Sequence, residues 1–142
     1  MKIHALKLKK GEDILLSIEK FSQAKNISAG AVLSGVGDLC EARLVHGTDL
    51  ALNPLKEDLE ITGLNGAVSA ARTHLHITLA KKDLSVIGGH LAHGCIAENG
   101  VEIILAEFEP DEVVSPETTD GAAADPNEYD SLVAKLFQGT KK

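Results

Sequence analysis

The amino-acid sequence predicts an α+β fold, a mostly antiparallel β-sheet with one long N-terminal helix and a short C-terminal helix packed on it. Between residues 27 and 109, short β-like runs follow one another and are separated by glycine and polar residues. Few helical patterns lie between these runs, and successive strands without crossover helices pair antiparallel. Apolar residues at helical spacing flank this region, within residues 14–21 and 129–136.

The N-terminal part of the chain predicts a strand followed by a helix. Residues 2–8 have the character of a first strand, and Gly11 then interrupts it. Glu12 and Asp13 follow, and acidic side chains are stabilised at the positive N-terminal end of a helix. Asn26 is the predicted end of this helix. Its buried face is predicted to be one apolar stripe, made of Ile14, Leu15, Ile18 and Phe21.

Six further segments have strand character, because they are rich in apolar and β-branched residues and are bounded by turn residues. They are residues 29–36, 40–46, 59–69, 73–80, 84–93 and 101–109. The segment Ser34-Gly35-Val36-Gly37 lacks both a full GxGxxG motif and a Gly-Lys-Ser/Thr motif, so it does not predict a phosphate-binding loop. We interpret it as a turn.

The composition changes after residue 109 and so divides the chain. Its 142 residues are the length of one ordinary domain, which we assign to residues 1–109. Proline, glycine and acidic residues make residues 110–127 a predicted linker or loop. Residues 128–142 predict a short C-terminal helix and tail that dock on the same domain.

The composition also predicts a soluble, cytoplasmic protein that is not associated with a membrane. No apolar run approaches the roughly 18 residues of a membrane span, and residues 1–10 lack the continuous apolar segment of an export signal. Cys40 and Cys95 lie far apart and form no CxxC motif, which predicts two reduced, buried thiols.

The net charge of −7 arises in one segment. Residues 110–130 contain no Lys or Arg, but they contain Asp111, Glu112, Glu117, Asp120, Asp125, Glu128 and Asp130. The rest of the chain is nearly balanced in charge. Proteins that bind nucleic acid usually concentrate Lys and Arg on one face, so a nucleic acid is an unlikely partner.

Three histidines form the most specific chemical pattern. The alternation from Thr73 to Leu79 places His74 and His76 on the same face of a strand, about 6.5–7 Å apart at the backbone. Two imidazoles can converge on one cation from that separation. If residues 81–83 form a tight, odd-numbered connection, His90 pairs with His74 on the next strand.

Such a cluster has two interpretations, a polar face of a half-buried strand or a metal site. The third histidine favours the metal, because three imidazoles leave a tetrahedral Zn²⁺ an open position for water or substrate. The same register places Gly88 opposite His76. Without side chains, Gly88 and Gly89 would let a backbone, a ligand or a metal-bound water approach the imidazoles.

Arg72 shares the strand parity of His74 and His76, so its guanidinium is a candidate to hold a substrate carboxylate. A solvated arginine at a strand edge is the alternative. His93 has the wrong parity to join the cluster unless a bulge intervenes. His4 and His46 are interpreted as ordinary surface or core residues. Glu102 and Glu107 could support the ligands or act as a general base, but ordinary surface carboxylates are the preferred interpretation.

Several of these motifs together resemble the PPC domain, also called the domain of unknown function 296, over residues 2–109. They are Gly11-Glu12-Asp13, Ser34-Gly35-Val36-Gly37, His74-Leu75-His76 and Gly88-Gly89-His90-Leu91. The histidine segments are the most specific. Leu84 departs from the pattern, because similar sequences often have glycine in this hairpin turn. The chain has no Arg-Gly-Arg-Pro element of the AT-hook that precedes the domain in plants, so we compare it with prokaryotic stand-alone members.

The resemblance implies a homotrimer with a mostly antiparallel sheet and a metal, zinc in our interpretation, on His74, His76 and His90. We therefore expect a small-molecule or partner-binding module, with a small anionic ligand as one candidate. The alternative is a zinc-dependent lyase or hydrolase acting on a small carboxylic or keto acid, since acetolactate decarboxylases share the general fold and a three-histidine zinc site. A DNA-binding regulator is the least favoured function. The sequence does not decide whether the protein is an enzyme.

Overall fold

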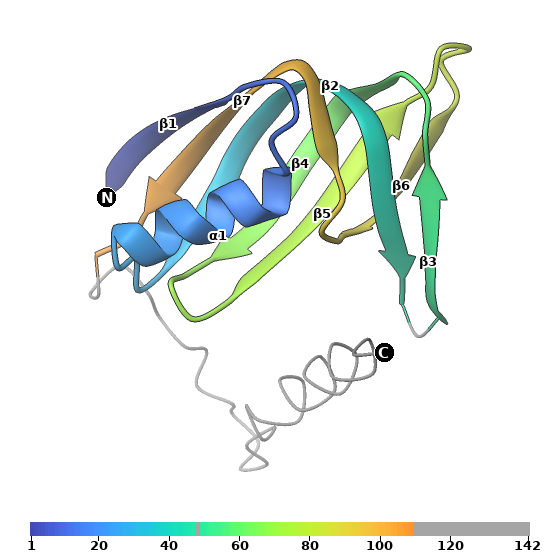
Figure 1. Ribbon diagram of the computed structural model, residues 1–142. Helices are drawn as coiled ribbons and strands as arrows, with labels where there is room; N and C mark the ends of the chain where they lie inside the picture. Colours follow the sequence, from blue (N-terminus) through green and yellow to red (C-terminus); the bar gives the residue numbers. More distant parts are fainter. Residues whose placement is uncertain (48, 110–142) are drawn as a thin grey trace.

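The computed structural model describes residues 1–47 and 49–109, which form seven antiparallel strands and one helix (Figure 1). The sheet order is β1-β7-β2-β4-β5-β6, with β3 paired to β2. The elements are β1 (Lys2–Leu8), α1 (Ile14–Ala24), β2 (Gly30–His46), β3 (Asp49–Leu55), β4 (Leu59–Val68), β5 (Thr73–Ala80), β6 (Val86–Leu91) and β7 (Ile96–Glu107).

The prediction of one long N-terminal helix is wrong. α1 begins and ends near the predicted residues, but it has only 11 residues, or about 16 Å at 1.5 Å per residue. The Asp13 side chain caps its N-terminus by accepting a hydrogen bond from the Leu16 N–H at 3.0 Å. Asn26 follows its C-terminus with a φ of 52°, which ends the helical path. The described part of the protein is therefore mostly antiparallel sheet.

The prediction of a turn at Ser34-Gly35-Val36-Gly37 is also wrong, because these residues lie within β2. The strand shifts its register against β7 between Val32 and Ser34 and again between Gly37 and Leu39. Gly37 has a φ of 137°, and a Cβ there would lie 2.3 Å from the Gly100 carbonyl oxygen. These glycines thus permit bulges and close strand packing instead of reversing the chain.

The C-terminal part of β2 closes four strands into a ring. Leu44 pairs with β3 on one edge and with Leu91 of β6 on the other, and Val45 pairs with His90. Since β2 also pairs with β4, β4 with β5 and β5 with β6, the ring is complete. Gly89 permits this closure, because a Cβ there would lie 2.8 Å from the Val45 carbonyl oxygen. β3 was not predicted from the sequence.

The turn between β5 and β6 determines which histidines face each other. The Lys81 carbonyl accepts a hydrogen bond from the Leu84 N–H, and the Lys81 N–H donates to the Ser85 carbonyl, both at 2.8 Å. Leu84 has a φ of 67°, so this is a three-residue loop whose last residue is left-handed. The predicted odd number of loop residues is confirmed, but the loop comprises residues 82–84, centred on Asp83, instead of residues 81–83. Ala80 therefore pairs with Val86, and the register differs by two residues from the predicted one.

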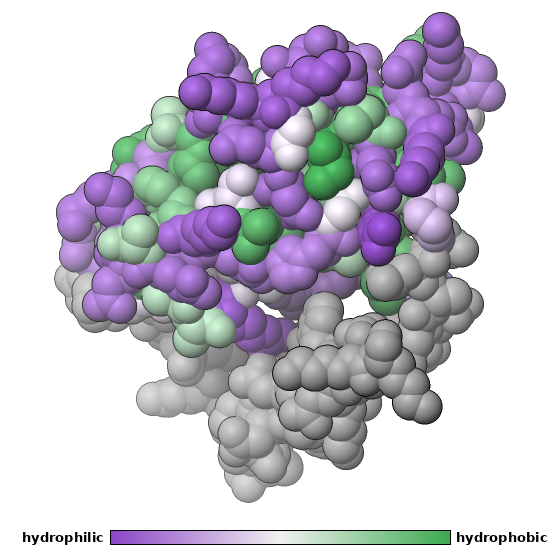
Figure 2. Space-filling model, viewed as in Figure 1, coloured by the Kyte–Doolittle hydropathy of each residue, from purple (hydrophilic) through white to green (hydrophobic). Residues whose placement is uncertain are grey.

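The inner face of the sheet and α1 enclose one hydrophobic core. On β5, Leu75, Ile77 and Leu79 are at most 1% exposed, and they pack in the same cluster as Ile14 and Ile18 of α1. The side chains that alternate with them, those of His74, His76 and Thr78, project from the opposite face of β5. The view in Figure 2 shows mostly hydrophilic side chains on the molecular surface, with smaller hydrophobic patches between them.

No helix in the described ranges is long and apolar enough to cross a membrane. The predicted linker at 110–127 and the helix and tail at 128–142 lie outside the described residues and stay predictions.

The left-handed backbone at Leu84 gives a stability prediction. A side chain costs about 1–2 kcal/mol in this conformation, whereas glycine adopts it freely but loses more entropy on folding. We expect Leu84→Gly to stabilise the protein by about 0.5–1 kcal/mol and to raise Tm by about 2–5 °C in thermal unfolding. Leu84→Ala is the matched control, because it removes the same exposed side chain but keeps the Cβ. Equal Tm values for the two variants would contradict the assignment of strain to this residue.

Candidate metal centre

Strand alternation and strand pairing bring the three histidines together on the outer face of β5 and β6. His74 and His76 project from β5 on the side opposite the buried Leu75. His90 is the direct partner of His76 on β6, in an antiparallel pair. On the other edge of β6, His90 pairs with Val45 of β2, so strands on both sides set its backbone position.

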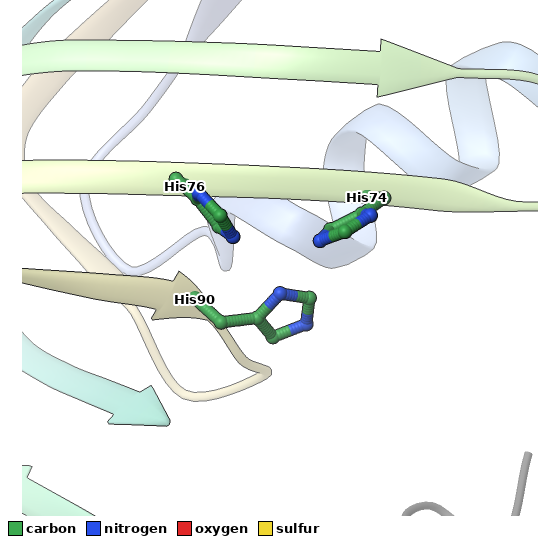
Figure 3. Close-up of side chains that lie close together, drawn as sticks. All are labelled: His74, His76 and His90. Atoms are coloured by element: carbon green, nitrogen blue, oxygen red, sulfur yellow. The ribbon is translucent and has the colours of Figure 1, made fainter. Parts of the chain in front are cut away.

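The three imidazole rings point toward one another (Figure 3). The ring centroid of His74 lies 5.1 Å from that of His76 and 4.9 Å from that of His90. The ring centroids of His76 and His90 are 5.7 Å apart. One nitrogen from each ring lies within 4.8 Å of the chosen nitrogens of the other two. The predicted convergence is present although the register differs, because a shift by two residues keeps all three side chains on one face.

The surroundings favour the neutral form of two of these imidazoles. Burial lowers the pKa of His74, and the nearby His76 and Arg72 lower it further. Burial also lowers the pKa of His90, followed by the effects of His74, His76 and Arg72. A neutral imidazole is the form that binds a metal ion, so protons compete weakly for these nitrogens near neutral pH.

The donor set fits a transition-metal ion. Imidazole nitrogen is a favoured ligand of zinc and of other first-row transition metals. Zn–N bonds are about 2.0–2.1 Å long, so modest rotations of the three rings would bring their nitrogens to one ion. His76 is exposed and the other two rings are half-buried, which leaves one side of the cluster open to solvent. The cluster could therefore hold one metal ion with a position left for a ligand.

Arg72 lies next to this cluster, at the end of the turn that precedes β5. The turn is held by Ser69, whose hydroxyl accepts a hydrogen bond from the Arg72 N–H and donates one to the Arg72 carbonyl, each at 3.0 Å. Arg72 and His74 both line a cavity of about 460 Å³. The charge of Arg72 acts on both His74 and His90, so its side chain forms part of the same electrostatic environment.

Gly88 and Gly89 serve strand packing. A Cβ on Gly88 would lie 2.9 Å from Thr78 Cγ2 and 3.0 Å from the Ile77 carbonyl oxygen. Gly89 faces the Val45 carbonyl, as described above. Of the alternatives considered for these glycines, the structure therefore supports close approach of another backbone. Neither glycine lines the cavity that Arg72 and His74 share.

The other candidate residues have separate partners. His93 Nε2 lies 2.8 Å from Glu19 Oε2, and His4 Nε2 lies 2.7 Å from Glu107 Oε2. Glu102 forms an ion pair with Lys7 at 3.1 Å. Cys40 and Cys95 are free thiols, as predicted, but only Cys95 is fully buried, and this burial raises its pKa to about 11.

The cavity is the feature that the sequence did not reveal. Its walls come from three distant segments, 28–30, 67–69 and Phe108, besides Arg72 and His74. No spacing pattern connects these segments. Strand pairing brings them together, since Gly30 pairs with both Val68 and Glu107.

Comparisons with known proteins agree with this fold. Bifunctional protein GlmU from Synechococcus sp. (strain JA-2-3B'a(2-13)) is 36% identical over 107 residues, which are 75% of this chain but only 17% of GlmU. Among solved structures, the metal-containing protein AF0104 from Archaeoglobus fulgidus has a TM-score of 0.63 and 29% identity, covering 75% of this chain and 79% of that one. A plant- and prokaryote-conserved (PPC) protein from Pyrococcus horikoshii has a TM-score of 0.68 and 24% identity, covering 84% of this chain and 87% of that one.

The family model for the Plants and Prokaryotes Conserved (PCC) domain matches residues 1–109. This range includes all three clustered histidines and all of the described residues. The resemblance inferred from the histidine and glycine motifs is thereby confirmed, and the chain belongs to the Plants and Prokaryotes Conserved domain family.

Proposed function

We propose that this protein binds one divalent transition-metal ion on His74, His76 and His90, and that the ion is zinc. The convergence of three imidazoles on one outer face of the sheet is the observation that supports this proposal. The solved relative from Archaeoglobus fulgidus is described as metal-containing, which is consistent with it. Soft thiolate ligands are not part of the cluster, and a set of imidazoles suits zinc.

The proposed activity is binding of a small molecule or partner at the open side of the ion. A site with three protein ligands retains a position for an external ligand, whereas structural zinc sites are closed by a fourth side chain. The second candidate is a zinc-dependent lyase or hydrolase. The cavity that is lined by Arg72 and by His74 of the cluster favours keeping this candidate, because a metal ion polarises a bound carbonyl or water.

We further propose a cytoplasmic homotrimer. The free thiols of Cys40 and Cys95 suit a reducing compartment. Ile3, Leu33 and Val36 are 55%, 57% and 52% exposed on strands β1 and β2. Apolar side chains of this size on one sheet are typical of subunit contacts.

The metal proposal predicts that the purified protein contains about one zinc ion per chain in elemental analysis. His74→Ala, His76→Ala and His90→Ala should each weaken zinc binding by more than about 100-fold, since loss of a supporting outer partner alone costs about 10–100-fold. His93→Ala is the matched control, because His93 pairs with Glu19 outside the cluster. Full zinc occupancy in all three cluster variants would refute the site.

The assembly proposal predicts a trimer in sedimentation at micromolar concentration. Leu33→Glu combined with Val36→Glu should shift the protein to a monomer, because the two added carboxylates of each chain, six in the trimer, would otherwise be buried around the threefold contact. Glu102→Gln, on an exposed side chain of the neighbouring strand β7, is the control for a surface change without added charge. A wild-type monomer under these conditions would rule out the trimer.

The charge distribution predicts that the protein does not bind duplex DNA at about physiological ionic strength. A net charge of −7 repels phosphates, and removal of residues 110–130 would leave a nearly neutral chain. Fluorescence anisotropy with labelled duplex DNA, for the full chain and for a chain lacking residues 110–130, would measure this. Tight binding that weakens steeply as salt rises would restore a DNA-binding function.

A further inference from the structure

The cavity beside the histidine cluster has the features of a ligand site. It is open to solvent and has a volume of about 460 Å³, within the range of about 300–1,000 Å³ that small-molecule sites occupy. Its lining residues are Ser28, Ala29, Gly30, Ala67, Val68, Ser69, Arg72, His74 and Phe108. Most of these are small or apolar, and Arg72 is the one Lys, Arg, Asp or Glu side chain among them.

Backbone hydrogen bonds hold the walls in place. The Phe108 N–H donates to the Ala29 carbonyl at 2.9 Å, and the Ala70 N–H donates to the Ile27 carbonyl at 2.7 Å. The Ser69 N–H donates to the Arg72 carbonyl at 2.7 Å, in addition to the two bonds of the Ser69 hydroxyl. A cavity with walls fixed before binding costs less conformational entropy when a ligand enters.

The charge and shape of the walls define the ligand. A guanidinium binds a carboxylate through two parallel hydrogen bonds, and its five N–H groups can serve more than one partner. The apolar surfaces of Ala67 and Phe108 suit a hydrocarbon body and disfavour a small, fully hydrated anion. The second cavity of similar size, about 450 Å³, adjoins the other end of β5 and mixes acidic side chains with Lys81 and Lys82, so it lacks this selectivity.

We propose that the cavity binds a small monocarboxylic acid with a short apolar body, whose carboxylate is held by Arg72 beside the metal centre. This assignment extends the proposed function and rests on it, because it assumes that a metal ion is bound at the histidine cluster. His74 connects the two parts, because it lines the cavity and belongs to the histidine cluster. The ligand would thus lie with its charged end toward the ion and its body against Ala67 and Phe108.

Calorimetric titration of the zinc-loaded full chain with butyrate tests this assignment. Butyrate should bind, whereas butyramide, which has the same body without the charge, should bind at least about tenfold more weakly. Arg72→Gln should weaken butyrate binding at least about tenfold and retain zinc. Arg43→Gln is the matched control, because Arg43 is the other arginine of the chain and lies outside the cavity lining.

A second variant tests the cavity without changing its charge. Ala67 pairs with His74 across β4 and β5, and its side chain is exposed, so Ala67→Leu should fold normally and reduce the room for the ligand body. It should weaken butyrate binding several-fold and affect acetate less. Equal butyrate affinity in wild type, Arg72→Gln and Ala67→Leu would overturn the inference. Inorganic phosphate binding as tightly as butyrate would overturn it as well, in favour of a general anion site.

The outcomes separate this inference from the metal proposal. If zinc binds and the affinity for butyrate does not depend on Arg72, only the carboxylate assignment fails. If the protein does not retain zinc, the metal proposal fails, and titration of the metal-free chain still measures whether Arg72 governs butyrate binding.

Discussion

The pairing of β6 between β5 and β2 is the constraint on which the site depends. His90 pairs with His76 on one edge of β6 and with Val45 on the other, so its position is set by two neighbouring strands. This double pairing requires Gly89, because a side chain there would meet the Val45 carbonyl. The histidine cluster therefore belongs to the rigid closed part of the sheet, where strand geometry positions the imidazoles before any ligand binds.

Local patterns were sufficient to predict many of the elements and the members of the cluster. The alternation around His74 and His76 predicted β5 over its observed bounds, and the apolar stripe after Asp13 predicted the position of α1. The parity argument selected His90 for the right reason, since any odd-numbered hairpin loop leaves it on the outer face. The predicted partner of His90 was wrong by two residues, because the left-handed residue of the loop is Leu84, at a position where glycine is the usual residue.

The failures arose where tertiary packing decides the structure. Glycines at 35 and 37 have the composition of a turn, yet in β2 they provide space for Leu64 and for the Gly100 carbonyl. The description of α1 as long was wrong although its ends were placed nearly correctly, because the cap at Asp13 and the positive φ at Asn26 enclose only three turns. The cavity could not be predicted at all, since its walls meet only after residues near 30, 68 and 108 have paired.

The position of β7 between β1 and β2 has a consequence for how the chain folds. Lys2 pairs with Glu107, so the first strand completes its hydrogen bonds with nearly the last residues of the described structure. The other edge of β7 pairs with β2, from Gly30 to Glu41. Sheets dominated by contacts so distant in sequence fold slowly, because long loops must close before the pairing stabilises them. During synthesis on a ribosome, β1 and α1 would emerge before β7 and would lack this partner strand until β7 has been made. During this interval their apolar side chains are accessible to chaperones.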